Sequence, residues 1–149
     1  MENTDYKNVE LLLVEDNPND AKLVKRAFKK FNLANKFFWV KDGEEAVDFI
    51  FAKGQYADRQ VEDTPKVILL DLKLPKVNGI DVLRRIREDE RTSMVPVVIM
   101  TSSKEEQDVV DTYKLGTNSY IVKPVDFDKF MVSVRDVGYY WLFTNQPPK

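Results

Sequence analysis

The sequence predicts an α/β fold with one doubly wound, five-stranded parallel sheet and five helices. Short runs rich in leucine and β-branched residues alternate five times with longer stretches of helical period, which is typical of a parallel sheet with covering helices. The third run, residues 67–70, is apolar throughout, as a strand covered on both faces should be. A chain of 149 residues is the size of one domain and buries roughly 70% of its unfolded surface. We expect a single domain over residues 1–149, with its core at about 8–137 and a C-terminal extension at 138–149.

The first two strand-helix units carry clear local signals. Residues 11–14 form the expected first strand, and Asn17 then caps a helix with Pro18 at its first position. Proline suits that position because its missing N–H would have no partner there. Residues 37–40 form the second strand, which ends at the turn 42–43 and leads into a second amphipathic helix.

The third strand follows a polar, turn-rich segment at residues 54–65. This segment is longer than most connections in a compact domain, and we expect a loop on the surface. The strand at 67–70 then ends at Asp71, and a loop containing Pro75 and Gly79 leads into the third helix. Its continuous apolar character predicts a place at the centre of the sheet.

The last two units complete the pattern. Residues 97–100 form the fourth strand, and the helix after it is expected to stop at Gly116. Residues 120–122 form the fifth strand, and Asp126 opens the final helix. The core-facing side of this helix carries apolar residues at helical spacing: Phe127, Phe130, Met131, Val134 and Val137.

The composition excludes several classes of protein. The chain has no cysteine, which excludes disulfides and zinc-thiolate sites, and no histidine, which excludes Ser-His and Cys-His catalysis. Its formal net charge of -2 gives no reason to expect nucleic acid as a direct partner. No apolar run approaches the roughly 20 residues of a membrane helix, and the polar start is not a signal peptide. We therefore expect a cytoplasmic protein without a membrane partner.

Polar side chains stand at the carboxyl ends of four predicted strands, where sheets of this class bind ligands. They are Glu15 and Asp16, Asp71, Thr101, and Lys123. Three neighbouring carboxylates repel one another without a cation, and an oxygen-only cluster favours Mg²⁺. A phosphoryl group on Asp71 would gain from that metal, from Lys123 and from the hydroxyl of Thr101. Asp71 is therefore the expected nucleophile.

Each of these residues has a simpler interpretation when it is taken alone. Asp71 could be a turn residue, and Glu15 and Asp16 could be solvated charges before a helix. Thr101 could be a helix cap, and Lys123 a surface lysine. None of these interpretations predicts that all five residues occur together at strand ends, and their co-occurrence favours a shared site.

The motifs resemble those of receiver domains of two-component response regulators, a family that includes the single-domain chemotaxis regulator. The resemblance covers nearly the whole chain and implies the flavodoxin-like receiver fold. Its motifs are Val14-Glu15-Asp16-Asn17, Leu70-Asp71-Leu72-Lys73-Leu74-Pro75 with Gly79, Met100-Thr101-Ser102, and Tyr120-Ile121-Val122-Lys123-Pro124.

The resemblance implies roles for individual residues. Asp71 would be the phosphoacceptor, and Mg²⁺, or alternatively Mn²⁺, would bind Asp16, Asp71, Glu15 through water, and the backbone carbonyl of Lys73. Thr101 and Tyr120 match the paired switch positions of the family. Lys123 matches the lysine that binds the phosphoryl group, and the Lys123–Pro124 peptide would be cis, as is usual in the family.

The resemblance also implies a partner. The donor in this family is a phosphohistidine on a sensor histidine kinase or a transfer domain, and a chain without histidine needs another protein to supply it. The 54–65 loop and the aromatic tail resemble those of small cyanobacterial regulators that pair with phytochrome-type kinases. Lys73 departs from the family because an uncharged residue is more usual there, which leaves the lifetime of the phosphoryl group open.

The final helix and its tail predict a homodimer. Their apolar side chains extend around the helix, and a continuous exposed apolar patch marks an interface. The expected interface residues are Phe130, Val134, Tyr139, Tyr140, Trp141 and Phe143. The alternative is that the tail folds back over its own core. No output domain is expected after the helix, so the output of the switch would be protein contact.

Three other functions fit the sequence less well. An aspartate-nucleophile phosphatase needs a second aspartate two residues after the first, where this chain has Lys73. A pseudo-receiver without phosphorylation would lack one of the site residues, and all are present. Nucleotide binding would need a glycine-rich phosphate loop, and neither common pattern occurs among the five glycines. The sequence therefore favours a phosphoacceptor signalling protein over an enzyme that acts on other substrates.

Overall fold

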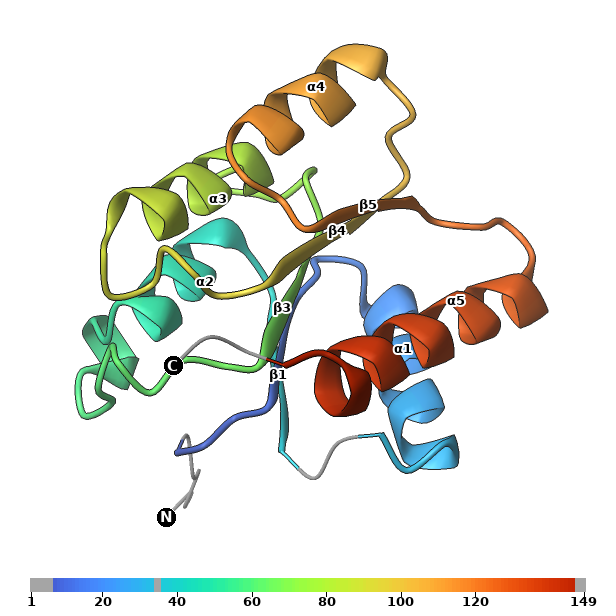
Figure 1. The fold of residues 1–149 in the computed structure, drawn as a ribbon, viewed down its shortest axis with the longest axis horizontal. Helices are drawn as coiled ribbons and strands as arrows, with labels where there is room; N and C mark the ends of the chain where they lie inside the picture. Colours follow the sequence, from blue (N-terminus) through green and yellow to red (C-terminus); the bar gives the residue numbers. More distant parts are fainter. Residues whose placement is uncertain (1–6, 34–35, 147–149) are drawn as a thin grey trace.

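The computed structural model describes residues 7–33 and 36–146, and this part of the chain forms the expected α/β fold (Figure 1). Five strands and five α-helices alternate along the described residues, with two short helical segments, η1 and η2, between and after them. The elements are β1 (Leu11–Val14), α1 (Pro18–Lys30), β2 (Phe37–Val40), α2 (Gly43–Ile50), η1 (Gly54–Tyr56), β3 (Val67–Leu70), α3 (Gly79–Glu88), β4 (Val97–Thr101), α4 (Glu106–Lys114), β5 (Ser119–Val122), α5 (Phe127–Tyr139) and η2 (Tyr140–Thr144).

All strands of the sheet are parallel, in the order β2-β1-β3-β4-β5. The chain moves outward from β1 to β2 and then crosses to β3 on the other side of β1, so the order reverses between β1 and β3. Val14 is in register with Leu70, and the Asp71 amide donates to the Val14 carbonyl oxygen at 3.1 Å. The residues that follow β1 and β3 therefore emerge side by side at the switch point, where sheets of this type bind ligands.

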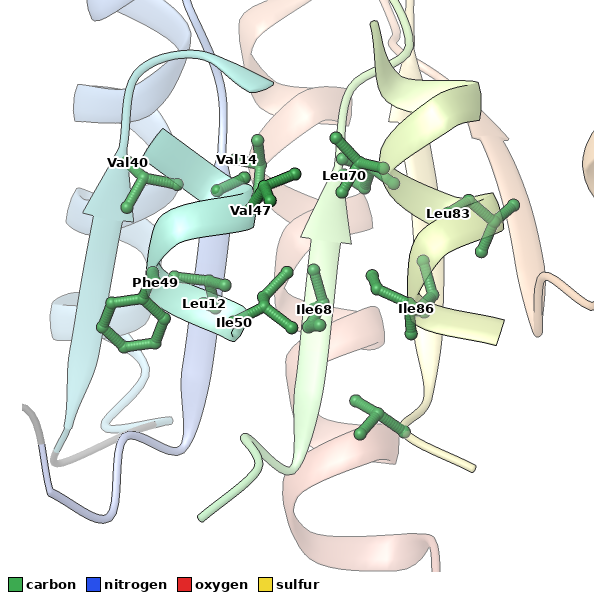
Figure 2. Packing of buried hydrophobic residues seen from close by; sticks show 14 of the residues in the cluster. Leu12, Val14, Val40, Val47, Phe49, Ile50, Ile68, Leu70, Leu83 and Ile86 are labelled. Carbon is green, nitrogen blue, oxygen red and sulfur yellow. The ribbon is translucent and has the colours of Figure 1, made fainter. Parts of the chain in front are cut away.

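Two apolar cores lie on opposite faces of the sheet. Helices α1 and α5 lie side by side on one face, and α2, α3 and α4 lie on the other (Figure 1). Figure 2 shows the second core, in which Leu12 and Ile68 of the strands face Ile50 of α2 and Ile86 of α3. The strand residues alternate between the two cores, as the period of two in a strand requires. The double cover explains why β1 and β3 are apolar throughout, and why β4 is apolar up to Thr101 at its end.

The buried side of α4 is smaller than its apolar residues suggest. Val110 and Tyr113 are exposed, and the fully buried side chain is that of Thr112. The Thr112 hydroxyl donates to the Asp108 carbonyl oxygen at 2.9 Å, so the helix's own backbone satisfies this buried polar group. Helix α4 ends at Lys114, and Gly116 follows the capping Leu115 with a φ of 86°. Gly116 thus stops the helix as predicted, because a left-handed conformation costs glycine little.

The 54–65 segment is anchored to the domain by buried side chains. Tyr56 packs edge-on against Phe49 and donates its hydroxyl hydrogen to Glu45 at 2.6 Å. The guanidinium of Arg59 lies 4.0 Å from the centre of the Phe49 ring and donates to two backbone carbonyl oxygens. The expected loop is therefore packed against α2. Tyr56 and Arg59 anchor it there, although the composition of the segment is mostly polar.

Two of the predicted dimer-interface residues on the C-terminal helix α5 are buried, and this part of the prediction is wrong. Phe130 and Val134 are buried in the core that α5 forms with α1, so their side chains are not available to a partner on the surface. Phe127, expected in the core, is instead 45% exposed. Periodicity identified an apolar stripe on this helix but could not show which residues α1 covers. Of the other predicted interface residues, Tyr139, Tyr140 and Phe143 are exposed, while Trp141 is half-buried.

Two further findings concern the peptide bonds and the character of the helices. No peptide bond between described residues is cis, so the expectation of a cis Lys123–Pro124 bond is wrong for this structure. The trans form is the lower-energy one for most bonds that precede proline. Among the described residues, no helix is long and apolar enough to cross a membrane.

Candidate functional site

The predicted site residues converge at the carboxyl edge of the sheet. Glu15 and Asp16 follow β1, and Asp71 follows β3. One carboxylate oxygen from each of these three residues lies within 4.8 Å of the other two. Glu15 and Asp71 are buried, and Asp16 is exposed. The strand order brings these acids together because β1 and β3 are neighbours in register.

Lys123 links this cluster to β5. Its ammonium group donates to Glu15 Oε1 at 2.7 Å, to Asp71 Oδ2 at 2.9 Å and to Asp20 Oδ2 at 2.9 Å. The Lys123 side chain is only 7% exposed, and its backbone amide donates to the Thr101 carbonyl oxygen at 2.7 Å. All three ammonium hydrogens are therefore directed at carboxylates, and β5 is held against β4 at the same point.

The charges of the site influence one another strongly. Burial raises the pKa of Glu15 to about 7, against the opposing effect of the hydrogen bond and charge of Lys123. Burial lowers the pKa of Lys123, but its hydrogen bonds to Glu15 and Asp20 and the nearby negative charges outweigh this effect and raise the pKa overall. Lys123 therefore stays charged at neutral pH.

The donor set fits a hard divalent cation. Glu15, Asp16 and Asp71 offer oxygen ligands only, which Mg²⁺ and Mn²⁺ prefer. One ammonium group does not balance the carboxylates gathered around it, and a divalent cation would supply the missing positive charge. The backbone amide of Lys73 donates a hydrogen bond to Asp71 Oδ1 at 3.2 Å. The role of its carbonyl as a ligand stays a prediction.

The loop after Asp71 passes so close to other backbone that two positions require glycine. A Cβ atom on Gly79 would lie 2.3 Å from the Asp71 carbonyl oxygen and 2.6 Å from the Leu72 Cα atom. A Cβ atom on Gly43 would lie 1.6 Å from the Val77 carbonyl oxygen. These close contacts fix the loop against the N-termini of α2 and α3, and thereby fix the direction in which Asp71 points.

Thr101 and Tyr120 are connected through Ser103. Thr101, at the end of β4, is fully buried, and its hydroxyl oxygen accepts a hydrogen bond from the Ser103 amide at 3.4 Å. The Tyr120 hydroxyl donates to the Ser103 carbonyl oxygen at 3.0 Å. Burial raises the pKa of Tyr120, so its hydroxyl remains a donor at neutral pH. The two predicted switch residues therefore contact the same short segment between β4 and α4.

Three residues of this neighbourhood were not predicted from the sequence. Asp20 contacts Lys123, Ser103 connects Thr101 with Tyr120, and the Trp39 indole N–H donates to the Glu15 carbonyl oxygen at 2.7 Å. Asp20 carries a weak signal, since acids are common in the first turn of a helix. Ser103 and Trp39 carry none, because their roles depend on which backbone atoms lie opposite them.

Comparison with known proteins agrees with the geometry. The family model of the response regulator receiver domain matches residues 11–135. A protein of Methanothrix harundinacea named "Probable methanogenesis regulatory protein FilR2" is 36% identical over 138 residues, which are 93% of this chain and 86% of that protein. Response regulator Rcp1 of Synechocystis sp. is 34% identical over 134 residues, 90% of this chain and 89% of that protein.

Solved structures agree as well. The Mn²⁺-bound form of Rcp1 and the phosphorylated cyanobacterial phytochrome response regulator RcpA each superpose with a TM-score of 0.87 at 33% identity, covering 95% of this chain and 99% of theirs. The bacteriophytochrome response regulator AtBRR is 45% identical with a TM-score of 0.71, covering 93% of this chain and 98% of its own. Family model, fold and strand-end residues agree, and the chain belongs to the response regulator receiver domain family.

Proposed function

We propose that this receiver domain accepts a phosphoryl group on Asp71 from a phosphohistidine of a sensor histidine kinase, with Mg²⁺ bound beside it. The observation that carries the proposal is the convergence of Glu15, Asp16 and Lys123 on the Asp71 carboxylate. The phosphorylated state of RcpA and the Mn²⁺-bound state of Rcp1 support it by similarity.

In the proposed step, an oxygen of the Asp71 carboxylate forms a bond to phosphorus while the P–N bond of the phosphohistidine breaks. The electron pair of that bond stays on the imidazole nitrogen. Lys123 and the Thr101 hydroxyl would donate hydrogen bonds to the phosphoryl oxygens as the group arrives. The metal ion, when bound to Asp16, Asp71, the Lys73 carbonyl and, through water, Glu15, supplies positive charge against the repulsion between phosphoryl group and carboxylates.

The proposed output is a change of surface. A phosphoryl group adds about -1.5 to -2 charges at neutral pH. Thr101 would turn toward it, and the contacts of Ser103 would carry that movement to Tyr120. Residues around β5 and α4 would then present a different surface to a partner protein. Hydrolysis of the same acyl phosphate, which the domain would catalyse on itself, would reset the switch.

We further propose a phytochrome-type kinase as the donor and a homodimer as the working form. The similarity to the phytochrome response regulator RcpA and the bacteriophytochrome response regulator AtBRR supports the first point, and the exposed Tyr139, Tyr140 and Phe143 support the second. In this proposal, residues 8–137 are the receiver core and 138–149 an extension of it. The cytoplasm is the proposed compartment.

Incubation with acetyl phosphate and Mg²⁺, followed by intact-mass measurement, tests the phosphoacceptor. The wild-type chain should gain the mass of one phosphoryl group, and Asp71→Asn and a sample with chelator should gain none. Asp81→Asn, on the first turn of α3, is a control that should behave as wild type. A folded wild type that gains no mass, or an Asp71→Asn variant that gains as much, would overturn the proposal.

A further inference from the structure

Asp20 is a fourth carboxylate at the site, and its side chain binds Lys123. It is the third residue of α1, and its Oδ2 accepts from Lys123 at 2.9 Å across 103 positions of sequence. Among the described residues, the carboxylate cluster that could hold a metal consists of Glu15, Asp16 and Asp71. Asp20 is not part of it. Asp20 is therefore placed to act on Lys123 rather than on a metal.

Phosphoryl transfer changes two of the three acceptors of Lys123. Asp71 loses the negative charge of the oxygen that becomes bonded to phosphorus, and Glu15 is one of the acids of the metal cluster. Asp20 neither bonds to phosphorus nor belongs to the metal cluster, so neither event removes its carboxylate from Lys123. Its backbone is held in the first turn of a helix, where its amide donates to the capping Asn17 at 3.2 Å.

A lysine side chain needs such an anchor. Its four-carbon stem rotates freely, and an ammonium group is a point charge without the fixed geometry of a guanidinium. An acceptor that stays in place would keep the Lys123 ammonium beside Asp71 while its other hydrogens turn to phosphoryl oxygens. We propose that Asp20 is a positioning residue that holds Lys123 at Asp71 during phosphoryl transfer, an inference that rests on the proposed phosphoacceptor function.

The simpler interpretation is that Asp20 only stabilises the N-terminus of α1, and α3 provides a matched control for it. Asp81 is also the third residue of its helix, and its amide also donates to a capping asparagine, Asn78, at 3.0 Å. Asp81 differs in its partner, which is Arg84 of the same helix. Asp81→Ala therefore removes a first-turn acid without touching Lys123.

The experiment compares phosphorylation rates with acetyl phosphate at saturating Mg²⁺. Asp20→Ala should slow phosphorylation about tenfold, as loss of a hydrogen bond to a charged group implies, while Asp81→Ala stays at the wild-type rate. Asp20→Asn keeps an acceptor oxygen and should recover most of the rate. In a Lys123→Ala background, Asp20→Ala should not lower the phosphorylation rate further, because Asp20 acts on the rate only through Lys123.

A second measurement is independent of phosphorylation. The Lys123 ammonium resonance can be identified in nitrogen-15 NMR spectra because it is lost in Lys123→Arg. It should be visible in the wild type and in Asp81→Ala, because three hydrogen bonds slow the exchange of the ammonium hydrogens with water. It should broaden or vanish in Asp20→Ala. An Asp20→Ala variant with wild-type rate and resonance overturns the inference, as does a full additional loss in the Lys123→Ala background. A wild type that takes up no phosphoryl group while the resonance responds as described overturns the proposed function instead.

Discussion

The Tyr120 hydroxyl donates a hydrogen bond to the backbone carbonyl oxygen of Ser103 at 3.0 Å. This bond joins the central residues of β5 to the segment that follows β4. The amide of the same serine donates to the Thr101 hydroxyl oxygen. A movement of Thr101 toward a phosphoryl group would therefore reach Tyr120 through one residue, with no need for a longer path through the core.

The first prediction concerns this link. Tyr120→Phe should leave the rate of Asp71 phosphorylation within about twofold of wild type and reduce stability by about 0.5–1.5 kcal/mol, the usual net effect of one hydrogen bond. Phosphorylation should then shift the amide NMR signals of residues 103–105 in the wild type and shift them less in the variant. Tyr113→Phe, on the exposed side of α4, is the control. Equal shifts in Tyr120→Phe and wild type would rule out the link.

The second prediction concerns metal binding. The Trp39 indole donates to the Glu15 carbonyl oxygen, so its fluorescence should respond when Mg²⁺ binds beside Glu15. The chain has two tryptophans, and Trp141→Phe leaves Trp39 as the single reporter. In that background, Asp16→Asn should raise the half-saturating Mg²⁺ concentration at least about tenfold, since even residues outside the ligand shell typically matter that much.

The control for this titration is Asp128→Asn, which removes an exposed acid from the first turn of α5. Its half-saturating Mg²⁺ concentration should match that of the parent. If Asp16→Asn also matches the parent, Asp16 is not a metal ligand and the proposed ligand set is wrong.

The sequence predicted the fold and the placement of five candidate residues at strand ends because both depend on local patterns. Each strand is a short apolar run, and each site residue directly ends or follows such a run, so strand order alone brings Asp16 and Asp71 together. The roles of Asp20 and Phe130 could not be predicted in this way. Asp20 and Asp81 look alike in sequence, and only the position of Lys123, far along the chain, distinguishes them. Whether Phe130 is buried depends equally on where α1 packs.

The third prediction concerns Arg87, which connects α3 to the loop that follows it and to the loop between α4 and β5. Its guanidinium donates to three backbone carbonyl oxygens and one side-chain oxygen, those of Ser93, Val95, Gly116 and Asn118. Lysine cannot match this fork of donors. Arg87→Lys should therefore lower the free energy of unfolding by about 1–3 kcal/mol, because it leaves polar groups without partners, as measured by urea denaturation.

Arg84→Lys is the matched control on the same helix. Arg84 is exposed and pairs with Asp81 one turn away, so the substitution should change stability by no more than about 0.5 kcal/mol. Equal effects of the two substitutions would show that the carbonyl contacts of Arg87 contribute nothing measurable.

The fourth prediction concerns acid pH. Hydrogen bonds from the Arg91 side chain and amide lower the pKa of Asp89 from 3.8 to about 2. Because the folded-state pKa lies below the unfolded value, the ion pair stabilises the protein above about pH 4, and this contribution is lost as the pH falls toward 2. A carbon-13 NMR titration of the Asp89 carboxyl should give a midpoint near 2 in the wild type and a higher one in Arg91→Gln. Arg135→Gln is the control, because Arg135 pairs with Asp136, and it should leave the Asp89 midpoint unchanged. An unchanged midpoint in Arg91→Gln would show that Arg91 does not lower the pKa of Asp89.

The fifth prediction concerns the proposed homodimer. Tyr139 and Phe143 are both more than half exposed, and their rings lie 5.5 Å apart, so they form a continuous apolar surface at the end of α5. Replacing both by serine should weaken self-association at least about tenfold, in line with the loss of two buried aromatic side chains, as measured by sedimentation equilibrium. Tyr113→Ser removes an aromatic ring of similar exposure from α4 and should leave association unchanged. Equal association of the double variant and the wild type would mean that this surface is not the interface. A loss of association in Tyr113→Ser alone would move the interface to α4.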